Sequence, residues 1–124
     1  MNPFVKSFTA AGACTHRRLA TFNANDGEIA QATGPTQRIA GVFDCPGGAT
    51  SGQRVDVILF GPADIDYGGT VLPGAYITAD ADGKAVAAAP AQGVNNFLAG
   101  RALVNAASGD IAKSFINTSV MQGA

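Results

Sequence analysis

Cys14 and His16 come closest, by residue type and spacing, to a nucleophile with its base. His16 is the only histidine of the sequence, and it follows Cys14 by two residues. A Cys-His pair works when its geometry is fixed and a third group orients the imidazole. These two residues fall in a stretch with no clear secondary-structure period, so we do not expect nucleophilic catalysis from them.

The same residues are poor candidates for a zinc site. Cys14, His16 and Cys45 are three candidate ligands, but no close pair of cysteines supplies half of a tetrahedral site. The cysteines can form a disulfide only if the fold brings their Cα atoms within about 7 Å. In a protein made in the cytoplasm, reduced thiols are the default. We predict no metal and no cofactor.

Two pairs of aspartates also invite a functional interpretation. Asp64 and Asp66 would lie on one side of a strand, where two carboxylates can act as acid and base or hold a metal. No second acidic cluster accompanies them, which favours a solvated connector. Asp80 and Asp82 resemble part of a calcium loop, but Ala89 stands where the loop needs a bidentate glutamate. A tight turn is the better interpretation.

The segment 47–54, GGATSGQR, superficially resembles a phosphate-binding loop. It lacks the lysine and the Ser/Thr that contact phosphate and metal, and it leads into a strand instead of a helix. We interpret it as a hairpin loop. With no catalytic constellation left, the sequence predicts that the protein is not an enzyme.

Composition narrows the class of protein further. The 124 residues suit one domain, and charged residues make up 14% of them, against roughly 25% in ordinary soluble domains. So few charges favour association with other surfaces. The net charge is −1 with scattered basic residues, which argues against nucleic acid. We see no membrane-spanning run and no signal peptide, so we expect a chain made in the cytoplasm with no membrane partner.

The elements that must position these residues are short strands. Gly, Pro, Asn or Asp interrupts the chain between runs with β-like content, and Asp26-Gly27 and Asp82-Gly83 are typical of hairpin turns. The segment 108–120 is rich in β-branched and aromatic residues, so we predict a strand there as well. The predicted runs are 17–23, 28–33, 38–44, 53–60, 75–80, 84–89, 97–104 and 110–117.

An internal repeat organises these runs into halves 17–61 and 73–118. Four landmarks recur in the same order: an Asp-Gly turn, an Ala-rich run, an Ala-Gly within a strand and a Ser-Gly before the last strand. Neither half can bury an apolar face alone, so the two are expected to close on each other. The predicted fold is all-β, a small compact barrel or sandwich of about eight short strands.

Residues 1–16 read as an extended N-terminal arm ahead of a single β domain, 17–124. The arm has no regular period but carries spaced apolar side chains. These side chains either fold back onto the domain as a satellite cluster or dock onto a partner. On the second interpretation, the candidate binding residues of the arm are Asn2, Pro3, Phe4, Val5 and Phe8.

The segment 75–89, AYITADADGKAVAAA, followed by 97–116, resembles the capsid decoration (cement) proteins of tailed bacteriophages. The strand 38–45 resembles the earlier Gly-Val strand of that family, so the likeness covers roughly residues 35–120. Arg101 stands where the family pattern has an apolar residue. The matching residues are Thr78, Asp80, Gly83, Lys84, Ala85 and Val86, then 98–103, then Gly109 and Asp110.

The resemblance implies a structural virion protein without chemistry of its own. Such a protein is made in the host bacterial cytoplasm and joins the outer surface of the expanded phage head. It often does so as a trimer on local three-fold axes, with an N-terminal arm that reaches the major capsid protein and bridges its subunits.

A small non-catalytic ligand-binding module, or an adaptor on a tail or fibre, is the alternative. Carbohydrate-binding modules usually offer exposed aromatic platforms. This chain has no Trp and only the two tyrosines Tyr67 and Tyr76, which makes that alternative weaker.

Overall fold

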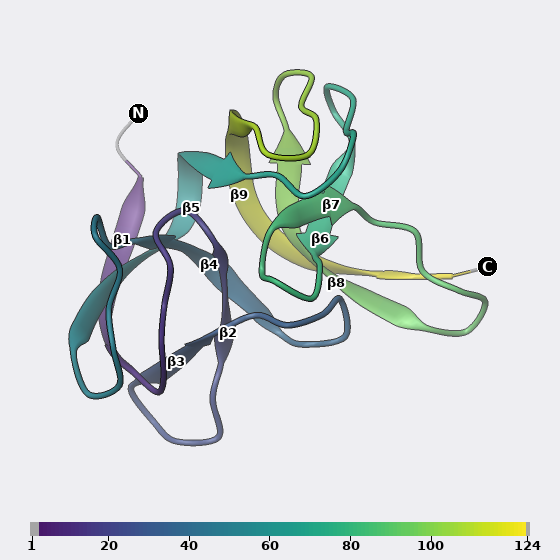
Figure 1. Cartoon of the computed structure of the whole chain (residues 1–124). Coiled ribbons are helices and arrows are strands. Elements are labelled where there is room, and N and C mark those ends of the chain that lie inside the picture. Colours follow the sequence, from purple (N-terminus) through teal and green to yellow (C-terminus); the bar gives the residue numbers. More distant parts are fainter. Residues whose placement is uncertain (1–2, 124) are drawn as a thin grey trace.

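The computed structural model describes residues 3–123, and these residues form an all-β fold without helices (Figure 1), as the sequence predicts. Every predicted run overlaps a strand, and one further strand lies near the N-terminus. The strands are β1 (Phe4–Ala10), β2 (Leu19–Phe22), β3 (Glu28–Gln31), β4 (Ile39–Asp44), β5 (Arg54–Asp66), β6 (Tyr76–Ala79), β7 (Ala85–Ala87), β8 (Asn95–Ala102) and β9 (Ile111–Gln122).

Both predicted Asp-Gly hairpins are present. Antiparallel pairing joins β2 to β3 and β6 to β7, and the glycine of each turn has a positive φ, 77° at Gly27 and 78° at Gly83. A residue with a Cβ is strained in this region, which is why glycine follows aspartate in both turns. The C-terminal strand is also confirmed, because β9 covers Ile111–Gln122.

All nine strands belong to one mixed sheet with the order β1-β3-β2-β4-β5-β9-β8-β6-β7. An additional pairing between β1 and β5 closes the first half of this sheet into a ring. In the second half a single parallel bridge, between Tyr67 and Ala85, links the end of β5 to β7. The halves lie side by side with β5 running from one into the other (Figure 1), so the fold is compact but not one evenly closed barrel.

The two halves share their strand register. The order β3-β2-β4-β5 in the first half corresponds to β7-β6-β8-β9 in the second. Several residue pairs recur 57 positions later in the chain. They are Phe8–Val55 and Ile65–Ala112, Thr9–Arg54 and Asp66–Ile111, and Cys14–Ala49 and Val71–Ala106.

This register moves the boundaries of the halves. The first half runs from residue 4 to 60 and the second from 61 to 117, whereas the sequence landmarks suggested 17–61 and 73–118. The boundary falls inside β5. In the first half, β1 pairs with the N-terminal part of β5. In the second half, the C-terminal part of β5 takes the place of β1 and pairs with β9.

The expected arm, residues 1–16, is wrong for the segment that forms β1. This strand pairs with β5 over six residues and with β3 at Thr9 and Ala10, so it is the first strand of the first half. Phe8 and Ala10 are buried, with 5% and 2% of their surface exposed. A strand that alternates only near its end shows too little period to be recognised from sequence.

At some equivalent core positions, one half has a large side chain where the other half has a small one. Ala10 in the first half corresponds to Tyr67 in the second, and Val57 corresponds to Ser114. The hydroxyl groups of Tyr67 and Ser114 are hydrogen-bonded to each other in the core. Ser114 therefore supplies the hydrogen-bond partner that the buried Tyr67 hydroxyl needs, because a buried hydroxyl without a partner is costly.

Glycine at the Ala-Gly landmark has a steric cause in both halves. A Cβ on Gly41 would lie 1.9 Å from the carbonyl oxygen of Ile58, and one on Gly100 would lie 1.9 Å from that of Phe115. The neighbouring strand passes too close for any side chain. This shared requirement preserves the landmark in both halves.

Candidate functional site

Apolar side chains are exposed where β1 meets the middle of β5. Phe4 is 63% exposed, Val5 40% and Phe60 44%, and Phe4 is the register partner of Phe60. The Phe60 ring packs edge to face on Phe115, with 5.3 Å between the ring centroids. We call Phe4, Val5 and Phe60 the N-terminal strip.

The strip lies beside an open strand edge. β3 pairs with β1 only at Thr9 and Ala10, so among the described residues the rest of this side of β1 has no strand neighbour. Unpaired N–H and C=O groups at such an edge can receive a further strand from a partner. The strip therefore combines exposed apolar area with free backbone hydrogen-bonding groups.

The structure divides the predicted arm residues into two groups. Pro3, Phe4 and Val5 are exposed. Pro3 lies against Gly61, since a Cβ added to Gly61 would be 3.0 Å from the Cα of Pro3. The prediction that Phe8 is a binding residue is wrong, because its side chain is buried in the first core. Its ring packs edge to face on Phe22, with 6.4 Å between the ring centroids. Asn2 lies outside the described residues.

Phe60 is the part of the strip that sequence reasoning missed. The run 53–60 becomes apolar on both faces toward its end, which was the available signal. That pattern was interpreted as a strand entering a core. The structure instead leaves the last side chain of the run on the surface, since β5 continues for six more residues into the second half.

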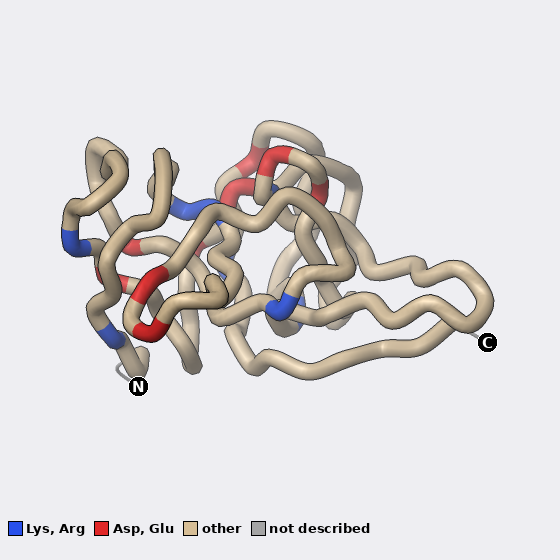
Figure 2. Tube along the Cα trace, turned by 90° about the horizontal axis from the view of Figure 1, so that it is seen from below, with Lys and Arg blue, Asp and Glu red and all other residues tan. Residues whose placement is uncertain are grey.

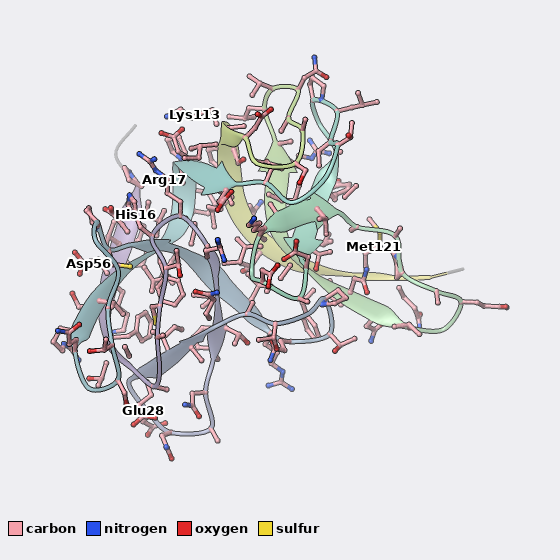
Figure 3. All side chains as sticks on the ribbon, in the orientation of Figure 1. His16, Arg17, Glu28, Asp56, Lys113 and Met121 are labelled. Atoms are coloured by element: carbon pink, nitrogen blue, oxygen red, sulfur yellow. The ribbon has the colours of Figure 1, made fainter. Side chains whose placement is uncertain are left out.

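Cys14, His16 and Cys45 are brought together, but not as a reactive site. His16 (Figure 3) accepts the backbone N–H of Cys45 on Nδ1 at 3.0 Å, and the Cys14 thiol donates to the Gly12 carbonyl. Burial, and then the nearby Cys45, raise the pKa of the Cys14 thiol to about 11. Burial, and then Asp44, also raise the pKa of Cys45. An activated thiol needs the opposite shift.

The aspartates have structural partners instead of a shared ligand. Asp64 pairs with Lys113 at 3.1 Å and Asp66 with Arg18 at 3.0 Å. Both acids lie in β5, so the predicted solvated connector is wrong. Asp80 accepts the backbone N–H of Asp82 and of Lys84, at 2.8 and 2.9 Å, as expected of a tight turn.

Residues 3–123 contain no group of three His, Cys, Asp or Glu side chains that could hold a metal ion. In the same residues no helix is long and apolar enough to cross a membrane. Lys and Arg are scattered along the chain (Figure 2), without a continuous basic stripe.

Sequence comparison gives no relative, since no protein-family model matches the chain and no curated protein matches it either. The fold, however, has a solved counterpart. It is similar to a phage head-fibre base. The head fiber gp8.5 N base of bacteriophage phi29 superposes with a TM-score of 0.69 at 17% sequence identity, over 94% of this chain and 95% of that chain.

The likeness to the phi29 base establishes the fold over nearly the whole chain. The matched protein is a head-fibre base, so the decoration-protein family suggested by the sequence finds no direct match.

Proposed function

We propose that this protein is a structural component of a tailed-phage virion that binds the outer surface of the expanded head. It would stabilise the shell by bridging major capsid subunits, as a trimer on local three-fold axes. The observation that carries the proposal is the fold likeness to the phi29 head-fibre base. Low charge and an exposed apolar strip add support, since both favour binding to a protein surface.

The N-terminal strip is the proposed contact with the capsid. Phe4 and Val5 would bury their side chains on the capsid, and the open edge of β1 would add a capsid strand to the sheet. In this arrangement the strip is held by a paired strand and not by a free arm. A preorganised strand loses less conformational entropy on binding than an arm does.

Co-sedimentation with purified expanded heads, from the phage whose genome carries this sequence, tests the proposal. We expect saturable binding at a simple ratio to the symmetry sites of the head. Replacing Phe4 and Val5 by serine should lower the affinity at least tenfold without unfolding the protein, because both side chains are exposed. The matched control is Leu72→Ser, which removes an apolar side chain 66% exposed in the other half. Absence of binding by the folded parent protein would overturn the proposal.

An adaptor on a tail or fibre is the second candidate, since the solved counterpart is itself the base of a fibre. The same assay separates the two functions when purified tails and heads are offered in parallel. Binding to tails alone would favour the adaptor.

A further inference from the structure

The two halves of the chain meet at a junction that covers one face of the first half. Leu19 and Val42, adjacent on β2 and β4, are 0% exposed and share a core with second-half residues such as Ile77. The Leu19 N–H donates to the Gly83 carbonyl at 2.8 Å. The β6–β7 turn of the second half is thus fixed against this face.

A positively charged side chain completes the junction. Arg18 donates through Nη1 to the Asp82 carbonyl at 2.9 Å and through Nε to the Asp66 carboxylate at 3.0 Å. Gln31 donates to the same Asp82 carbonyl at 2.9 Å. The face of the first half therefore binds the backbone carbonyl groups of the Asp82-Gly83 turn.

The equivalent face of the second half is open. Tyr76 and Arg101 correspond to Leu19 and Val42 in register, yet Tyr76 is 41% exposed and Arg101 is exposed as well. The Arg101 guanidinium lies 4.7 Å from the Tyr76 ring centroid and donates to its hydroxyl at 2.8 Å. We call Tyr76, Arg101 and Phe115 the open face; they line a hollow of about 460 Å³.

The equivalent turn of the first half is also open. Asp26 corresponds to Asp82, and it is exposed together with Asn25 in the β2–β3 hairpin. Glu28, labelled in Figure 3, marks the end of this hairpin that points away from the second half. The Thr9 N–H donates to the Gly27 carbonyl at 2.8 Å, so this carbonyl is already bonded and the exposed Asp26 side chain is the group left for a partner.

We propose that the open face of one copy binds the Asp26 turn of a second copy. The open face carries the cation of Arg101 and the turn carries the carboxylates of Asp26 and Glu28, so the two surfaces are complementary in charge. As at the junction within a chain, an arginine beside a strand face meets an Asp-Gly turn, although Arg101 stands in register with Val42 and not with Arg18. Such a contact is heterologous, because the two copies use different surfaces, and it builds a ring when the rotation closes. The inference deepens the oligomer of the proposed function and specifies its surfaces.

Mass in solution, measured by light scattering and sedimentation, tests this interface without any capsid. The parent protein is expected to be oligomeric, and Arg101→Glu and Asp26→Arg are each expected to give monomers. The Arg101→Glu protein keeps an intact turn and the Asp26→Arg protein keeps an intact face. In an equimolar mixture each face meets a turn of opposite charge on the other variant, so the two proteins should assemble with each other. Combining both substitutions in one chain restores the charge pair and should restore the parent mass.

Arg38→Glu is the control, since it makes the same charge change at an exposed arginine of the first half. Urea unfolding of each variant separates loss of assembly from loss of folding. A monomeric parent protein, an unchanged mass for folded Arg101→Glu, or a mixture that stays monomeric would overturn the inference. Head binding is measured in a separate assay, so a failure there leaves this result intact.

Discussion

At the scale of single residues, Arg17 and Gly74 occupy equivalent positions in the two halves. Arg17 has a φ of 68° and is the one non-glycine residue with a positive φ among residues 3–123, while Gly74 has a φ of 84°. The Arg17 N–H donates to Phe43 at 3.0 Å, and its carbonyl accepts the N–H of Asp66 at 2.9 Å. These bonds hold Arg17 in a conformation that costs an L-residue about 1–2 kcal/mol.

Replacing Arg17 by glycine should therefore stabilise the protein. The expected gain in free energy of unfolding is about 0.5–1 kcal/mol, since glycine relieves the strain but adds entropy to the unfolded chain. Gly74→Ala should lower the free energy of unfolding by about 1 kcal/mol. Urea unfolding of both variants measures the two effects, and a destabilised Arg17→Gly would contradict the argument.

Cys14 likewise has an apolar counterpart, Val71, and both side chains are buried. The folded pKa of Cys14 is about 11, above its ordinary value of 9.0. Between these two values the unfolded chain releases the thiol proton while the folded protein retains it. Stability should therefore be complete below pH 9 and fall as the pH rises toward 11, by about 2–3 kcal/mol at most from this group.

Cys14→Val should keep the stability of the parent protein at pH 7.5, because the second half accepts valine at the same place. The variant should also lose less stability between pH 8 and pH 10.5 than the parent does. Urea midpoints at the two pH values provide the measurement. The interpretation fails if parent and variant lose the same stability.

At the scale of elements, β1 decides whether the first half forms a ring. It is the only strand that links β3 back to β5 in the first half, and its Phe8 fills the first core. The exposed Phe4 and Val5 of the same strand are expected to contribute little to folding. The two ends of β1 are thus expected to differ in role, one binding a partner and the other stabilising the fold.

Deleting residues 2–12 should unfold at least the first half. Loss of a buried phenylalanine alone costs about 3–5 kcal/mol, which is a large share of the roughly 5–15 kcal/mol that stabilise a typical domain. Phe4→Ser should change the free energy of unfolding by less than about 1 kcal/mol, since this side chain is 63% exposed. Circular dichroism and urea unfolding distinguish the outcomes. A folded, stable deletion variant would restore the arm interpretation.

At the scale of the whole molecule, the halves are similar but not independent. Leu19, Ile39 and Val42 come from the first half, yet they belong to the core that fills the second. β5 contributes strand pairs to both halves. Separating the halves would expose this shared apolar surface.

The protein should therefore unfold in one cooperative step despite its internal repeat. Amide signals of the two halves, followed by NMR through a urea titration, are expected to disappear with one midpoint. A half that keeps its native signals after the other has lost them would show that the shared core contributes less than we infer.

Much of the fold follows from the sequence alone. Glycine and aspartate fix the hairpin turns at Asp26-Gly27 and Asp82-Gly83, and β-branched runs fix the strands between them, because these preferences act over a few residues. The order of the landmarks also indicates the repeat. A sequence reader can thus predict an all-β protein with two similar halves.

The tertiary structure decided which residues are buried and which remain available. Phe4 and Phe8 look alike in sequence, but one is exposed and the other buried, because their environment comes from β5, about fifty residues away. The partners of Asp64 and Asp66, Lys113 and Arg18, are equally remote in sequence. Pairing between distant strands sets these environments, and they cannot be predicted from local sequence patterns.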